Sequence, residues 1–573
     1  MQLARHEKRI VALCLVGCFA LAAGSAAQKS VTVDEYQALP HGLAICKTGD
    51  FHLATGVPVL PSVLPALPLL ATEARLFTAN MPAYTSSWQC GLQFVVENGF
   101  ERDPGSGRPL PSGRYHDYFL LGRLTSIAVL LLTCGLAYGY SRSLHGPIAG
   151  LLTLAVACLS PNLLAHGRLV TPDIFLAAAA LGSLWAFDRL LLAPNCARSC
   201  TLGICLGLAA LCKLTGLLLF VLIPFCSMCF WLADYLHSRR DTPIANRRQR
   251  IWPFLLLSLL VGVIVINAGY LFDGTCTSLG RFRFESVLMH RFAALLPAWL
   301  PVPLPRYFFQ GIDAQLAESG YAAYLMGRFN ETGFYSYYLV ALLVKTPLPI
   351  LLLCGLAWFR VGRPTRREMP LVVVAALMLL FFSLSRHKNI GVRYVLFLEP
   401  MMAIWIGRLL IDSAAPRTWL RRTVIVAVGC LAAVTLTSWP HFLPYFNWVS
   451  GGPAHGHRWL LDSNLDWGQD LVALRRYMER EGIEGIDLAH FGRVPPEVYG
   501  IRYRTLRAGE RRQNPHVAIS ANLLWGLMNV VNGDLNYWPD DSDAYRAFRG
   551  LRPKAVLGHS IYVFEIADQE PGG

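Results

Sequence analysis

Apolar segments long enough to cross a lipid bilayer recur from the N-terminus to about residue 439. A helix needs about 20 apolar residues to span the hydrocarbon core. The segments that approach this length cover residues 11–27, 117–139, 146–165, 173–192, 201–236, 252–272, 334–359, 369–385, 394–411 and 423–439. Residues 201–236 are too long for one helix and are interrupted at Lys213, so they count as two crossings. The sequence therefore predicts a polytopic α-helical membrane protein with about 11 transmembrane helices.

Composition agrees with this fold class. Of the 573 residues, 54% are hydrophobic and 15% are charged, whereas soluble domains carry about 25% charged residues. The formal net charge is +14, but many arginines lie in short loops, such as those at Arg142, Arg247 and Arg366. That distribution marks the cytoplasmic side of a membrane protein. The composition thus excludes a soluble enzyme, and the charge does not indicate nucleic-acid binding.

The arginine-rich loops predict the topology. They place the N-terminus in the cytoplasm of a bacterium and the C-terminus in the periplasm, with the chain in the inner membrane. The large outer loops are then residues 29–116 and 273–333. Residues 11–27 also fit a cleaved signal peptide, because a basic flank precedes them and small residues end them. We favour a retained helix, and in both cases Gln28 onward lies outside.

The composition becomes that of a soluble protein after the last apolar segment. We expect a membrane domain over residues 1–439 and a small α/β extracytoplasmic domain over residues 440–573. An amphipathic helix is predicted over residues 470–481, with Asp466 at its N-cap and Gln469 at the third position. Strands are predicted over residues 485–492, 516–522 and 554–566.

Two further features belong to the outer loops. The run Val57–Leu70 is apolar but short and interrupted by prolines, so we expect a helix that lies at the membrane surface. Cys46, Cys90 and Cys276 all fall in predicted outer loops, and a disulfide among them is an open alternative.

Ionisable side chains gather at the predicted outer ends of the apolar segments. They are Asp34, Glu35, His41, Asp50, His166, Asp173, Lys213, Lys345, Arg386, Arg393 and Tyr394. A charged side chain near the membrane surface costs free energy unless it has a partner or a function. The alternatives without a catalytic role are that Asp34 caps a short helix and that the cations reach toward lipid headgroups.

This mixture of carboxylates and cations suits a transfer reaction with a lipid phosphate as the leaving group. A carboxylate could take the proton of an acceptor hydroxyl, and Lys213 and Lys345 could stabilise the charge left on a departing phosphate. The sequence holds no nucleotide-binding loop of the GxxxxGK[ST] type. An activated, lipid-linked donor would explain its absence.

The stretch DEYQALPHGLAICKTGDF resembles the first outer loop of GT-C glycosyltransferases. The similar group is family 39, or protein O-mannosyltransferase-like enzymes, which includes the aminoarabinose transferases of lipid A. The matching features, in order within residues 9–411, are Asp34-Glu35, Gly49-Asp50-Phe51, Asp173, Lys213 and Arg393-Tyr394. One departure is Gly56-Val57-Pro58-Val59-Leu60, where the family has a Pro-Pro-Leu run.

The resemblance implies an inverting sugar transfer from a polyprenyl-phosphate donor. Asp34 would be the catalytic base, with Glu35 and Asp173 in support. Lys213, Arg393 and Lys345 would bind the donor phosphate. The acceptor would be a lipid, glycan or protein. No cofactor is certain, and a divalent cation is an open alternative.

Two other functions stay open at this point. A transporter or lipid flippase would place polar or broken spans near the bilayer midplane, whereas the polar residues here lie at outer ends. A non-catalytic receptor or scaffold that binds cell-envelope glycans would need no base. The altered proline run keeps that second alternative open.

Overall fold

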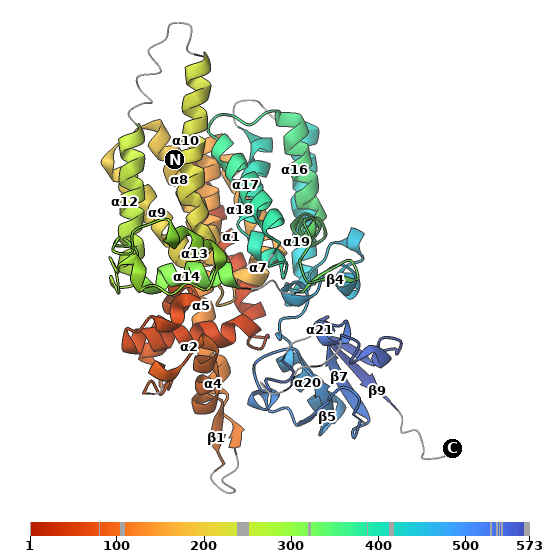
Figure 1. Ribbon diagram of the computed structural model, residues 1–573. Helices are drawn as coiled ribbons and strands as arrows, with labels where there is room; N and C mark the ends of the chain where they lie inside the picture. The colour runs from red at the N-terminus through yellow and green to blue at the C-terminus, as the bar shows by residue number, and fades with distance from the viewer. Residues whose placement is uncertain are drawn as a thin grey trace.

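The computed structural model describes residues 2–79, 81–103, 109–237, 251–318, 322–386, 388–411, 418–510, 512–527, 530–534, 537, 539 and 542–566. Most of these residues form a helical bundle. Two smaller units lie side by side at one end of it: the helices that follow α1, and the C-terminal sheet domain (Figure 1). The N-terminus lies toward the other end of the bundle (Figure 1).

Every segment predicted to cross the membrane contains a helix. The bundle helices are α1 (Gln2–Ala26), α5 (Arg114–His145), α6 (Pro147–Cys158), α7 (Pro161–Gly167), α8 (Pro172–Leu192), α9 (Cys196–Cys212), α10 (Leu218–His237), α12 (Ile251–Gly269), α15 (Tyr337–Lys345), α16 (Leu348–Val361), α17 (Met369–Ser385), α18 (Leu398–Gly407) and α19 (Thr418–Ser438). Within the described residues, 6 helices are long and apolar enough to cross a membrane, or up to 8 if two bent pairs count as single spans. The predicted number of 11 is therefore not reached by length and composition, because α9, α17 and α18 are shorter.

Two predicted crossings are bent rather than straight. The axes of α6 and α7 differ by 62°, and those of α15 and α16 differ by 109°. The second break falls at Thr346-Pro347, where Thr346 is extended with ψ 132°. Proline restricts the residue before it to extended backbone and cannot donate a helical hydrogen bond. The crossing expected over residues 334–359 is therefore bent at this point, and α15 runs in a different direction from α16.

The predicted interruption at Lys213 is confirmed. Helix α9 ends at Cys212, Lys213 is extended at φ −162° and ψ 138°, and a 3₁₀ turn follows over Leu214–Leu217. Gly216 allows this turn, because a Cβ there would lie 2.2 Å from the backbone oxygen of Ala209.

The two outer loops fold into short elements. The first contains α2 (Val33–Thr48), α3 (Val59–Ala66), the 3₁₀ turn η2 (Leu67–Ala71), α4 (Ser87–Asn98) and the antiparallel pair β1 (Phe100–Arg102) and β2 (Pro109–Pro111). The second contains α13 (Val287–Ala294), α14 (Arg306–Ala317) and the hairpin of β3 (Ala323–Leu325) and β4 (Arg328–Asn330). The apolar helix expected over Val57–Leu70 is present as α3 and η2. Cys46, Cys90 and Cys276 are free, so the disulfide is not formed.

The C-terminal domain is built on a five-stranded sheet with the order β6-β5-β7-β9-β8. Its strands are β5 (Ile486–Ala489), β6 (Tyr503–Thr505), β7 (His516–Ser520), β8 (Ala555–Leu557) and β9 (Ile561–Glu565). Strand β5 pairs parallel with β6 and β7, and β9 pairs antiparallel with β7 and β8. Helix α20 (Leu471–Glu481) packs its apolar side chains, such as Leu474, against this sheet. The sequence predicted the helix and the strands β5 and β7. The single strand predicted over residues 554–566 is the antiparallel pair β8 and β9, and β6 was missed.

The predicted cap of α20 is wrong. The helix begins at Leu471, and Asp466 lies before it with a fully buried side chain. The Asp466 carboxylate accepts hydrogen bonds from the backbone N–H groups of Gly468 (3.1 Å) and Asn522 (3.3 Å). Asp466 therefore holds a turn against the sheet domain instead of starting a helix.

Candidate active site

The N-terminus of α2 is capped by Thr32 and Glu35. Glu35 Oε2 accepts from the backbone N–H of Thr32 at 3.0 Å and from its hydroxyl at 3.0 Å, as in a capping box. Asp34 is therefore not the cap, so the purely structural alternative for this residue is wrong. Its carboxylate takes part in a different set of contacts.

Glu35 forms a fully buried ion pair with Arg123 of α5. Arg123 Nε and Nη2 lie 2.9 Å and 2.6 Å from the two carboxylate oxygens, and the Val170 N–H donates to the same carboxylate at 3.0 Å. Burial opposes ionisation of this carboxyl, but Arg123 and the backbone N–H donors hold the pKa of Glu35 below its usual range. Glu35 does not line the cavity that Asp34 faces. Its contacts hold the start of α2, the helix that carries Asp34.

A cavity of about 500 Å³ lies between the first outer loop, α9–α10, α14 and α17. Asp34, Lys213, Lys388, Arg393 and Tyr394 contribute polar groups to its lining. The apolar part of the lining includes Leu211, Leu214, Leu217, Leu218, Val221, Phe381 and Phe382. Asp34, Lys213, Arg393 and Tyr394 were predicted to belong to one site, and all four line this cavity. The segments that carry them are up to 360 positions apart (394 minus 34).

The charged groups at this cavity alternate in sign. Arg393 Nη1 lies 2.7 Å from Asp34 Oδ2 and 3.6 Å from Asp173 Oδ2, and Lys213 Nζ lies 2.8 Å from Asp173 Oδ1. The Lys213 ammonium also lies 3.9 Å from the centre of the Tyr394 ring. Asp173 is buried and does not line the cavity, but it pairs with Lys213 and Arg393, two of the cations that do. The arrangement can bind an anion between two fixed cations, with a carboxylate beside it.

Other cavity residues were not predicted. Gln37 follows Asp34 by three positions on α2, and residues three apart share a helix face, so it could have been found by spacing. Gln315 comes from α14 of the second outer loop, and its Oε1 accepts from Lys388 Nζ at 2.9 Å. No spacing rule links Gln315 to Asp34, because the two segments meet only in the folded chain.

Several predicted site residues do not line the cavity. The buried Lys345 ammonium donates to the backbone oxygens of Leu443 and Asn464, each at 2.7 Å, so it has a packing role in place of the predicted phosphate contact. His41 and His166 are buried side chains. Asp50 pairs with His52 at 2.8 Å, and the Arg386 guanidinium lies 4.2 Å from the Tyr335 ring centre.

The cavity fits a divalent cation poorly. Asp34, the carboxylate in its lining, already pairs with Arg393, and the buried Asp173 pairs with Lys213, so a cation would have to displace these groups. In the part of the chain that the structure describes, one group of three ligand-type side chains is close enough to share an ion. It consists of Cys18, Cys134 and Cys158 inside the bundle, and none of the three lines the cavity.

The sequence model of one protein family matches part of the chain. It is described as dolichyl-phosphate-mannose-protein mannosyltransferase and matches residues 117–266. The matched range includes Asp173 and Lys213 but neither Asp34 nor Arg393. The predicted resemblance to this group of glycosyltransferases is confirmed over these residues. Among curated protein sequences, none matches the chain significantly.

Solved structures of two enzymes are similar to this chain. ArnT from Cupriavidus metallidurans, bound to undecaprenyl phosphate, is 16% identical with a TM-score of 0.44, and the match covers 83% of this chain and 72% of that one. The oligosaccharyltransferase AglB from Archaeoglobus fulgidus, in complex with an inhibitory peptide and a dolichol-phosphate, is 12% identical with a TM-score of 0.37. That match covers 74% of this chain and 56% of AglB.

Proposed function

We propose that this chain is a membrane glycosyltransferase of the GT-C type. It would transfer a sugar from a polyprenyl-phosphate donor to an acceptor at the periplasmic face of a bacterial inner membrane. The observation that carries the proposal is the shared cavity, where Asp34, Lys213 and Arg393 meet beside an apolar wall. The family description over residues 117–266 names a donor of this kind, a sugar on a polyprenyl-type phosphate.

The charges at the cavity support a direct displacement. Arg393 and Lys213 bind the donor phosphate, which competes with Asp34 for Arg393 and leaves the Asp34 carboxylate free to act as a base. Asp34 takes the proton of the acceptor hydroxyl while its oxygen bonds to the anomeric carbon. The bond from that carbon to the phosphate oxygen breaks, and the electron pair stays on the phosphate, where the two cations stabilise it. The products are an inverted glycoside and polyprenyl phosphate.

The apolar wall supports a lipid-linked donor over a free sugar phosphate. Leu218 and Val221 of α10 and Phe381 of α17 line the cavity, and both Val221 and Phe381 are also exposed on the bundle surface. A polyprenyl chain could therefore pass from the cavity toward the lipid while its phosphate stays between the cations. Binding sites for such ligands combine an apolar lining with a few charged groups.

The proposed periplasmic location rests on the arrangement of the chain. Helices α2 and α14, which contribute to the cavity lining, lie at the end of the bundle that carries both outer loops and the sheet domain (Figure 1). Arg366 and Arg367 lie in the turn before α17, in one of the loops that the arginine distribution assigns to the cytoplasm.

The test is a transfer assay with the purified full chain in detergent. Undecaprenyl-phosphate-linked sugars labelled in the sugar are supplied with a panel of lipid, glycan and peptide acceptors. The proposal predicts labelled acceptor, release of undecaprenyl phosphate, and inversion at the anomeric carbon. Binding of the donor with no transfer to any acceptor would instead favour a receptor that recognises envelope glycans.

A further inference from the structure

A short segment of the C-terminal region lies between the two chain segments that carry the cavity's central ion pair. We call residues Ser463–Gln469 the bridging segment. It precedes α20 and belongs to the polypeptide that leads into the sheet domain. Its backbone and side chains contact the residue directly before Asp34 and the residue directly before Arg393.

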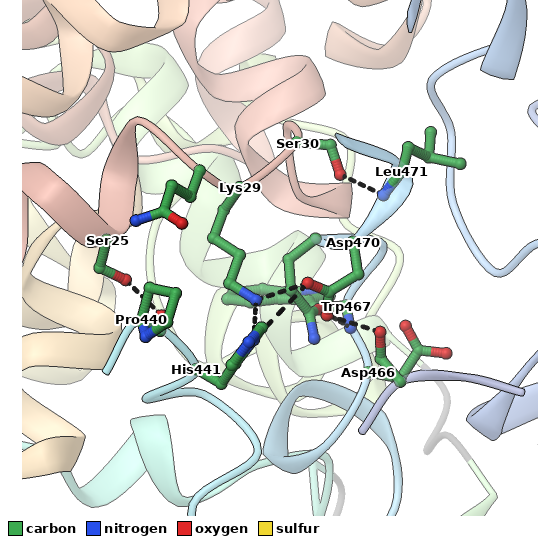
Figure 2. Close-up of polar contacts among 12 residues, drawn as sticks. Ser25, Lys29, Ser30, Pro440, His441, Asp466, Trp467, Asp470 and Leu471 are labelled. Atoms are coloured by element: carbon green, nitrogen blue, oxygen red, sulfur yellow. Dashed lines mark hydrogen bonds and ion pairs between the residues drawn. The ribbon is translucent and has the colours of Figure 1, made fainter. Parts of the chain in front are cut away.

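The first set of contacts holds the start of α2. The Val33 N–H donates to the Trp467 carbonyl at 3.1 Å, and the Ser30 N–H donates to the Gln469 carbonyl at 2.9 Å. The Ser30 hydroxyl donates to the Gly468 carbonyl at 2.8 Å and accepts from the Leu471 N–H at 3.0 Å (Figure 2). The backbone that presents Asp34 is therefore fixed to the bridging segment.

The second set of contacts holds the turn that presents Arg393. The Val392 N–H donates to Asn464 Oδ1 at 2.9 Å, and the Ser463 hydroxyl donates to the Ile390 carbonyl at 2.7 Å. Gly391 packs so closely that a Cβ there would lie 2.2 Å from Ser463 Oγ. This side of the bridging segment thus sets the position of the Arg393 backbone.

Trp467 contacts the Arg393 side chain itself. The guanidinium carbon lies 4.3 Å from the centre of the Trp467 ring, and the indole is 2% exposed. A cation held over a buried indole gains electrostatic attraction without a competing charge. The ring therefore orients Arg393 without neutralising it, and Arg393 can still bind an anion.

The bridging segment is also tied to the sheet domain and to the end of α1. Asn522 Nδ2 donates to the Asp466 carbonyl at 2.7 Å. Asp470, next to the segment, accepts from the Ser560 hydroxyl at 2.7 Å and from the ammonium of Lys29 (Figure 2). The sheet domain, the bundle and the cavity therefore share one network of contacts.

We infer that the bridging segment is the positioning element of the active site, with Asn464 and Trp467 as its positioning residues. It sets the distance and direction between Asp34 and Arg393, and the sheet domain is required because it holds the segment in place. This inference rests on the proposed function for its catalytic meaning. The contacts themselves can be tested separately.

The structural test measures amide hydrogen exchange in the full chain in detergent. Asn464→Ala removes the acceptor of the Val392 N–H, and Ser30→Ala removes the side chain that binds the segment beside α2. We expect exchange to rise roughly tenfold in peptides that contain Val392 and Val33, respectively, and to stay unchanged in α9. Ser463→Ala, which removes one hydroxyl, is the milder variant if Asn464→Ala does not fold.

The functional test measures binding of undecaprenyl phosphate and initial transfer rates. Trp467→Leu removes the aromatic face, and we expect the dissociation constant for undecaprenyl phosphate to rise roughly fivefold. Trp467→Phe keeps an aromatic face and should restore binding to within about twofold of the wild type. Trp448→Phe is the matched control, because Trp448 is 84% exposed.

The two proposals fail in different ways. If the wild type binds no undecaprenyl phosphate and transfers no sugar, the proposed function is wrong, and the exchange data alone decide the positioning role. If Asn464→Ala and Ser463→Ala leave exchange at Val392 unchanged, the positioning inference is wrong. It is also wrong if Trp467→Leu binds undecaprenyl phosphate as the wild type does.

Discussion

At the scale of single residues, the neighbours Asp34 and Glu35 have separate tasks. Glu35 is fully buried against Arg123, whereas the Asp34 side chain is 27% exposed and faces the cavity. The family resemblance implied that Asp34 is the base with Glu35 in support, but the residues alone could not show how Glu35 gives that support. That division depends on Arg123, which lies 88 positions from Glu35 on another helix.

Glu35→Gln should destabilise the fold far more than it changes donor binding. Removing one partner of a buried ion pair leaves the other charge uncompensated, at a cost of about 3–5 kcal/mol. A large fall in the apparent melting temperature is expected. Glu101→Gln is the control, since Glu101 is 55% exposed in its pair with Arg114. Equal melting temperatures for the two variants would contradict this account of Glu35.

Asp466 should make stability depend on pH. Burial raises the pKa of Asp466 to about 7, whereas the pKa of an unfolded Asp is about 3.9. The folded state therefore binds this proton more tightly than the unfolded state does. The stabilisation of the fold by the bound proton is complete below about pH 4 and is lost as the pH rises to about 7. The free energy of unfolding should fall by on the order of 4 kcal/mol over this pH range.

The measurement is the apparent melting temperature between pH 5 and pH 8. The wild type should lose stability over this range, and Asp466→Asn should show a smaller slope even if its melting temperature is lower throughout. A slope that is the same in both proteins would show that Asp466 does not titrate in the expected range.

At the scale of helices and turns, the break at Lys213 places a cation at the cavity. The sequence predicted this break because a charged residue interrupts an apolar run too long for one helix. The bend at Thr346-Pro347 was not predicted as a change of direction. Proline signals a break, but the angle depends on what α15 packs against.

Gly216→Ala should disturb the Lys213 turn. The added methyl group would lie 2.2 Å from the Ala209 backbone oxygen, so the backbone must move. We expect a loss of stability of more than about 2 kcal/mol and weaker binding of undecaprenyl phosphate. Gly355→Ala is the matched control, because a Cβ there meets nothing within 4 Å. Normal binding of undecaprenyl phosphate by Gly216→Ala would show that donor binding does not depend on the conformation of the Lys213 turn.

At the scale of the whole molecule, the candidate site is assembled from segments far apart in the sequence, of which the family resemblance had brought together Asp34, Lys213 and Arg393-Tyr394. The apolar segments, their order and the sheet domain were predicted from periodicity and composition. The contacts of the bridging segment with the residues before Asp34 and Arg393 were not, because they join groups far apart in the chain. Val33 and Trp467 are 434 positions apart (467 minus 33), and Val392 and Asn464 are 72 positions apart. The first outer loop and the sheet domain also share a hydrophobic cluster that includes Phe94 and Val498.

The topology can be tested with native cysteines. Cys196 is the first residue of α9, at the predicted cytoplasmic side, Cys276 lies in the second outer loop, and both are exposed. A membrane-impermeant maleimide should label Cys276 through a permeabilised outer membrane, and Cys196 only after the inner membrane is broken. Cys276→Ser and Cys196→Ser variants identify the labelled site. The opposite pattern would place the cavity on the cytoplasmic side.

Asp34 is proposed to act as the base in sugar transfer from a polyprenyl-phosphate donor. The most direct measurement is the single-turnover rate of the purified wild type, Asp34→Asn and the control Asp117→Asn, an exposed aspartate at the start of α5. With undecaprenyl-phosphate-linked sugar bound, Asp34→Asn should transfer roughly 10²–10⁴-fold more slowly, and Asp117→Asn should match the wild type. Transfer by Asp34→Asn at the wild-type rate would contradict the account.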